Sequence, residues 1–80
     1  MKIFFENAEA LLGGIQEVAA ELDFTLADKE QAELTVSVFA VDERILHVTR
    51  EGKTATITYG DGYARFFRAL AILIGKSREG

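Results

Sequence analysis

Few side chains of this chain could do covalent or acid–base chemistry. The sequence has no Cys and a single His, His47, which argues against thiol catalysis, a serine–histidine pair, a disulfide framework and a thiolate metal site. Asp42 and Glu43 are adjacent carboxylates, and such pairs act as acid and base when they are buried and unequally perturbed. Here they lie between two expected strands, next to Arg44, which favours a solvated turn. We therefore predict no catalytic residue, no metal site and no cofactor.

The segment "YGDGYA", residues 59–64, is rich in glycine and precedes an expected helix. Backbone N–H groups at a helix N-terminus can hold a phosphate, but the segment lacks both the Walker and the GxGxxG patterns. Asp61 also places a negative charge where such an anion would bind. We interpret Asp61 as a helix cap and the two glycines as turn residues.

Basic residues are concentrated in the second half of the chain. Residues 1–43 carry ten acids and two bases, a net charge of −8, whereas residues 44–80 carry three acids and seven bases, a net charge of +4. This asymmetry can mark a nucleic-acid face, on which Phe39 would offer a stacking surface. The strands carry no glycine–aromatic signature of RNA-binding sheets, so we expect no nucleic-acid partner and interpret the charges as elements facing each other or solvent.

Length and composition predict one domain over residues 1–80. Hydrophobic residues make up 49% and charged residues 28% of the chain, which is typical of a folded globular domain. No secretory signal is readable after Met1, and the longest apolar run, residues 69–74, is too short to span a bilayer. The sequence therefore favours a cytoplasmic protein with no membrane partner. The ending "SREG", directly after an expected helix, predicts a fragment of a longer chain.

Elements that would position these residues can be read along the first half of the chain. The β-rich residues 2–6 predict a strand, and apolar positions at helical spacing predict a helix over residues 8–22, with Asn7 as its N-cap. Residues 23–33 form a polar connection that includes a short extended piece. Residues 34–41 alternate between apolar and other side chains, which predicts a strand with one buried face.

The second half predicts a β-hairpin followed by a helix. Residues 45–50 and 53–59 alternate, and the pair Glu51-Gly52 between them suits a two-residue loop with positive φ at the glycine. The helix is expected to begin after Asp61 and to end at Gly75. Its expected inner face is apolar: Tyr63, Phe66, Phe67, Leu70, Leu73 and Ile74.

These elements, in the order β-α-β-β-β-α, predict a two-layer sandwich of the α+β or α/β class. The strand-helix-strand portion favours a right-handed crossover, and the last three strands favour an antiparallel meander. We expect a mixed, mostly antiparallel four-stranded sheet with two helices on one face.

Five residues indicate a second packing surface on the outer side of the helices. Ala69 and Ile72 are expected to project away from the core face of the second helix, among Arg65 and Arg68. Gly13 is expected to point outward from the first helix, where it costs about 1 kcal/mol relative to Ala without helping the core. Apolar and small residues together on an outer face indicate a surface that meets a partner.

The run "HVTREGKTATITYGDGYARFFRALAILIG", preceded by "AELTVSVFAV", resembles a known domain. It is similar to the small non-catalytic α/β domain that precedes the barrel in glycoside hydrolase family 20, the β-N-acetylhexosaminidases, and most of all in bacterial members without a secretion signal. The resemblance covers nearly the whole chain. The residues that carry it are structural: Gly52, Lys53, Ile57, Tyr59, Phe66, Phe67, Arg68, Ala69 and Leu70.

The resemblance implies that any chemistry belongs to a (β/α)8 barrel that follows in the same parent chain. In that family an adjacent Asp-Glu pair of the barrel acts with the substrate's own acetamido group. A barrel needs about 250 residues and cannot be part of these 80, and Asp42-Glu43 lacks the His-x-Gly-Gly lead of the family pair. The family's helices lie between sheet and barrel, so the expected function is that of a non-catalytic N-terminal accessory domain. The alternative is a free-standing ligand-binding or regulatory module that dimerises through its sheet or its helices.

Overall fold

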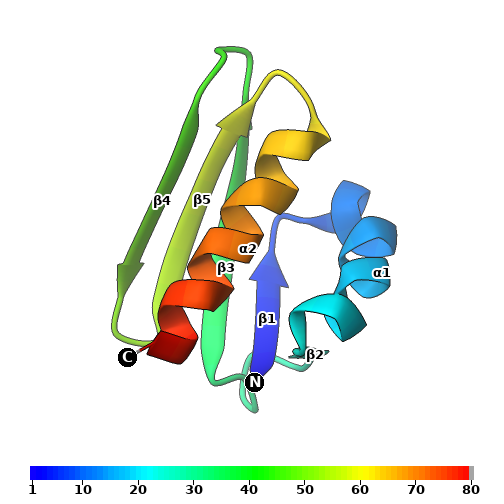
Figure 1. Ribbon diagram of the computed structural model, residues 1–80, viewed down its shortest axis with the longest axis vertical. Helices are drawn as coiled ribbons and strands as arrows, with labels where there is room; N and C mark the ends of the chain where they lie inside the picture. The colour runs from blue at the N-terminus through cyan, green and yellow to red at the C-terminus, as the bar shows by residue number, and fades with distance from the viewer. Residues whose placement is uncertain (80) are drawn as a thin grey trace.

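The computed structural model describes residues 1–79 and forms a sheet with helices packed against it (Figure 1). The elements follow one another as β1 (Lys2–Glu6), a 3-10 turn η1 (Glu9–Leu11), α1 (Leu12–Leu22), β2 (Thr25–Leu26), β3 (Leu34–Val41), β4 (Leu46–Glu51), β5 (Thr54–Gly60) and α2 (Tyr63–Glu79). The expected strands, the hairpin and both helices are therefore present.

The strands form a five-stranded sheet in the order β2-β1-β3-β5-β4. β1 pairs in parallel with β2 and β3, β3 pairs in parallel with β5, and β4 and β5 form an antiparallel hairpin. The predicted four-stranded, mostly antiparallel sheet with a meander is therefore wrong, whereas the mixed sheet and the α+β class are confirmed. The short extended piece expected in the connection is β2, which supplies the fifth strand.

The hairpin enters the sheet through its second strand. β5 buries Ala55, Ile57 and Tyr59, whereas Leu46 and Val48 of β4 are only half-buried. β5, which has the more deeply buried apolar face, is the inner strand. β4, which contains the charged residues Arg50 and Glu51, is the edge strand, where charged side chains discourage pairing with other chains. Alternation predicts the face that a side chain occupies, but it does not specify which strands are neighbours.

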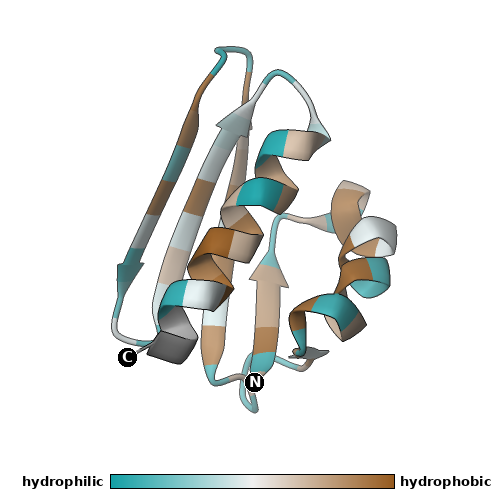
Figure 2. Cartoon of the chain, viewed as in Figure 1, coloured by the Kyte–Doolittle hydropathy of each residue, from teal (hydrophilic) through white to brown (hydrophobic). Residues whose placement is uncertain are grey.

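A single core fills the space between the sheet and the two helices. Along each inner strand alternate side chains point into it, and Figure 2 shows the resulting alternation of hydropathy along β4 and β5. α2 packs against β5 and β4, and α1 lies beside β2 and α2. The largest fully buried side chains come from both layers: Ile3, Ile15, Leu34, Val36, Ile57, Phe66, Leu70, Leu73 and Ile74.

Two expected cap positions differ in the structure. Asn7 has a left-handed backbone, with φ of 60°, and belongs to the turn before η1 rather than to a helix cap. Asp61 also has positive φ, 62°, and lies two residues before the first residue of α2, so its backbone is not that of an N-cap. Asn and Asp tolerate this conformation better than other non-glycine residues, which makes their turn and cap roles hard to separate by sequence.

The hairpin loop and the end of α2 also shift. Glu51 pairs with Thr54, so the loop is Gly52-Lys53, and Gly52 has the expected positive φ, 61°. α2 does not stop at Gly75 but continues to Glu79. Gly75 lacks the positive φ of a helix-ending glycine. Leu73 and Ile74 are buried immediately before it, and this packing stabilises the helix at that point.

Candidate functional site

The acids and the histidine with possible chemistry lie apart from one another and in solvent. Asp42 and Glu43 are exposed in the connection between β3 and β4, and His47 is exposed on β4, opposite Thr58 of β5. Among residues 1–79 no group of three or more His, Asp or Glu side chains is placed to hold a metal ion. Nor is any helix of this range long and apolar enough to cross a membrane.

Four of the five residues predicted on the outer side of the helices are at least partly exposed. Gly13 and Arg68 are exposed, Arg65 is half-buried, and Ile72 leaves 42% of its surface exposed in the third turn of α2. Ala69 is the exception: it is fully buried, so its predicted outward position is wrong. It lies three residues after Phe66, which places it on the apolar stripe of the helix.

The sequence missed two apolar residues that also lie open on the helices. Tyr63 was expected in the core but is 59% exposed in the first turn of α2, and Leu12 is 39% exposed in the first turn of α1. Both residues lie at the first position of their helix: Leu12 follows η1 directly, and Tyr63 follows the turn after β5. We define the outer helix surface by Leu12, Arg65, Arg68 and Ile72.

The two helices meet through a glycine and an aromatic ring. A Cβ at Gly14 would lie 2.5 Å from Cζ of Phe67, so the absence of a side chain lets α1 approach α2. Phe67 in turn packs edge-on against Phe66, with ring centroids 5.1 Å apart. Gly14 therefore allows a close approach between the two helices.

Asp61 is the ionic centre at the start of α2. Its Oδ2 lies 3.4 Å from Nε of Arg44 and 4.0 Å from Nη2 of Arg65. The Arg44 side chain is mostly exposed, whereas that of Arg65 is only 31% exposed. Exposed pairs of this kind contribute little to stability, so their main effect is to hold the arginine side chains near the helix start.

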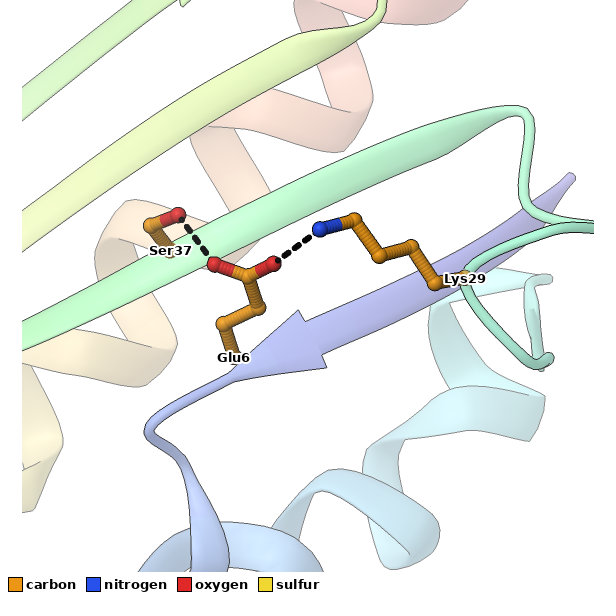
Figure 3. Close-up of polar contacts among 3 residues, drawn as sticks. All are labelled: Glu6, Lys29 and Ser37. Carbon is orange, nitrogen blue, oxygen red and sulfur yellow. Dashed lines mark hydrogen bonds and ion pairs between the residues drawn. The ribbon is translucent and has the colours of Figure 1, made fainter.

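The face of the sheet opposite the helices is open and mostly polar. Figure 3 shows a polar cluster on this face, in which Glu6 of β1 forms an ion pair with Lys29 at 3.1 Å and accepts a hydrogen bond from the Ser37 hydroxyl at 3.2 Å. The Lys29 hydrogen bond and charge, with Ser37 adding to them, lower the pKa of the Glu6 carboxyl below its ordinary value. Phe39 on the same face is 48% exposed.

Tyr59 is the titratable side chain most affected by the core. Its ring lies 5.6 Å from that of Phe66, and burial, with a smaller effect of the Tyr63 phenol, raises the pKa of Tyr59 above its ordinary value. A phenol that is protonated at neutral pH and surrounded by apolar rings does not provide a base. The Tyr59 ring therefore serves as part of the core.

Comparisons of the chain with protein-family models, with curated proteins and with solved structures gave no match.

Proposed function

We propose that this chain is a non-catalytic N-terminal accessory domain of a family 20-type β-N-acetylhexosaminidase and that its helices pack on the catalytic barrel of that parent chain. The observation that carries the proposal is Ile72, a large apolar side chain that is 42% exposed on α2, one turn after the exposed Arg68 and two turns after the half-buried Arg65. Isolated exposed apolar residues are common, but Leu12, which is 39% exposed on α1, is a second exposed apolar side chain in the helix layer. The sequence resemblance supplies the kind of partner, a (β/α)8 barrel.

The arrangement of the two layers supports a scaffolding role. One face of each helix is used to cover the sheet, and the opposite face has no element of this chain over it, as Figure 1 illustrates for residues 1–79. If the helix layer lay between the sheet and a barrel, both faces of each helix would be covered, one by the sheet and the other by the barrel. In this role the domain supports the barrel and cleaves no hexosaminide itself.

The test replaces Ile72 by Asp, both in the parent chain and in the 80-residue chain. A charge is costly at a packed interface but costs little in water, so the melting temperature should fall by several degrees more in the parent chain. Thr49→Asp, on the open face of the sheet, is the matched control, and its effect should be the same in both chains. Equal effects of Ile72→Asp in the two chains would contradict docking through this surface.

The second candidate, a free-standing module that dimerises through its sheet, is favoured by the exposed Phe39 on the open face. The reading frame separates the two candidates. We expect the codons to continue past Gly80 for several hundred residues into a barrel with an adjacent Asp-Glu pair, and a stop codon there would favour the module. Turnover of a chromogenic N-acetylglucosaminide by the purified 80-residue chain would contradict a non-catalytic role.

A further inference from the structure

A hollow of about 380 Å³ opens between the loop that precedes β4 and the first two turns of α2. Charged side chains form most of its walls, and apolar atoms of two side chains complete them. We call it the arginine hollow. Its lining consists of Arg44, Leu46, Asp61, Ala64, Arg65 and Arg68.

The charge in the arginine hollow is not balanced. Three guanidinium groups face one carboxylate, and Arg44 and Arg65 both approach the same oxygen, Oδ2 of Asp61, at 3.4 and 4.0 Å. The side chain of Arg68 makes no hydrogen bond or ion pair with the residues that the structure describes. The lining of the arginine hollow therefore has a net charge of +2, on a chain whose overall net charge is −4.

The chemistry of the lining selects one class of ligand. Each guanidinium presents a planar set of N–H donors that matches the two oxygens of a carboxylate or the oxygens of a phosphate. Arg65 is about two-thirds buried, which lowers the local dielectric constant and strengthens its attraction for an anion relative to a fully solvated arginine. The Asp61 carboxylate already lies within 4.0 Å of both Arg44 and Arg65, so an oxyanion can approach the same two guanidinium groups.

We propose that the arginine hollow is a binding site for a small dianion that carries carboxylate or phosphate groups. The dianion contacts Arg68 and Arg65, and Arg44 closes over it from the loop. Asp61 competes with the ligand for Arg44 and Arg65 and sets the affinity. The site shares Arg65 and Arg68 with the outer helix surface, so it is tested in the 80-residue chain, where no barrel can cover those arginines.

The experiment follows the Nε–Hε signals of the arginines by nuclear magnetic resonance in the ¹⁵N-labelled 80-residue chain. Phosphate and succinate are added in separate titrations at constant ionic strength, with chloride as the balancing salt. We expect saturable shifts confined to Arg44, Arg65 and Arg68, and the tighter of the two titrations identifies the anionic group. Chloride alone should produce no saturable shift.

Variants test the roles of single residues. Arg65→Gln should weaken the anion affinity about tenfold, because a charge-assisted contact is lost. Asp61→Asn should strengthen it several-fold, because the internal competitor loses its charge. Arg50→Gln, on the hairpin outside the arginine hollow, is the matched control and should leave the affinity unchanged.

The outcomes decide between this inference and the proposed function. Shifts that match those in chloride, or an equal loss in Arg65→Gln and Arg50→Gln, would overturn the binding site. Weaker binding in Asp61→Asn would also overturn it, because Asp61 would then support the ligand and not compete with it. None of these results bears on the docking of Ile72 to a barrel, which is measured in the parent chain.

Discussion

The two faces of the sheet are built from the same strands but differ in the side chains that they carry and in how deeply these are buried. On the covered face, inner strands place Ile3, Val36 and Ile57 in the core with no measurable exposure. On the open face, the same strands carry threonines, the half-exposed Phe39, and Glu6 and Ser37, which form a cluster with Lys29 from the connection between β2 and β3. One face therefore holds the apolar contacts that stabilise the domain, and the other leaves polar groups paired at the surface.

The difference shows where a small domain obtains its stability. No polar or charged residue is buried among those described, so the covered face has no desolvated charge to compensate. An 80-residue chain has little core to lose, and each large apolar residue on that face carries a substantial share of the folding free energy. Substitutions on the open face should change the folding free energy much less.

The largest expected effect compares neighbouring residues of β5 that point to opposite faces. Ile57→Ala should lower the free energy of unfolding by about 2–5 kcal/mol, because it removes a fully buried side chain and leaves a cavity. Thr56→Ala should lower it by less than about 1 kcal/mol, through a small loss of strand propensity. Urea unfolding followed by circular dichroism measures both, and equal losses would abolish the distinction between the faces.

The faces themselves were predictable from the sequence. Period-two alternation over residues 34–41 and in the hairpin placed Val36 and Ile57 inward and the threonines outward, because consecutive side chains of a strand point to opposite sides. The neighbours of each strand were not predictable, because the parallel pairing of β3 with β5 depends on which hairpin strand packs more deeply. The alternation of side chains within one strand does not indicate which of the two hairpin strands will pair with β3.

The second prediction applies the same comparison to α1, where two adjacent glycines point to the inside and the outside of the helix layer. Gly13→Ala should stabilise the protein by up to about 1 kcal/mol, because its Cβ would meet nothing within 4 Å and helix propensity improves. Gly14→Ala should be less favourable than Gly13→Ala by about 1–3 kcal/mol, because its Cβ would press on the Phe67 ring. Thermal unfolding of the two variants gives this difference directly, and identical stabilities would mean that the ring moves aside freely.

The candidate surface was predictable only in part. Helical spacing predicted the exposed Ile72 and Arg68, but Ala69 was misplaced because a small residue at the margin of a stripe fits either face. The arginine hollow combines Arg44 from a loop with Arg65 and Arg68 from α2, residues more than twenty positions apart in the sequence. Its only sequence signal was the basic second half, which does not show which charges converge.

The smallest expected effect concerns the open face and is a change of pKa. Lys29→Met should raise the pKa of Glu6 towards its ordinary value of 4.5, because Lys29 is the main cause of the lowering. Ser37→Ala should raise it less, because the Ser37 hydroxyl contributes less than Lys29. Carbon-13 NMR of the Glu6 carboxyl over pH 2–7 measures both shifts (about the titration range of a carboxyl).

The sign of the pH dependence follows from that lowering. The folded state holds the Glu6 proton more weakly than the unfolded state does, so the contribution of the cluster to stability is complete above pH 4.5 and is lost as the pH falls through the lowered value. Lys29→Met should remove most of this acid-side dependence. Lys76→Met, on α2 and across the sheet from Glu6, is the control and should leave the Glu6 titration unchanged, whereas equal changes in both variants would point to net charge and not to the pair. A large loss of stability at pH 7 in Lys29→Met would contradict the comparison itself, because an exposed ion pair on the open face would then matter as much as the core.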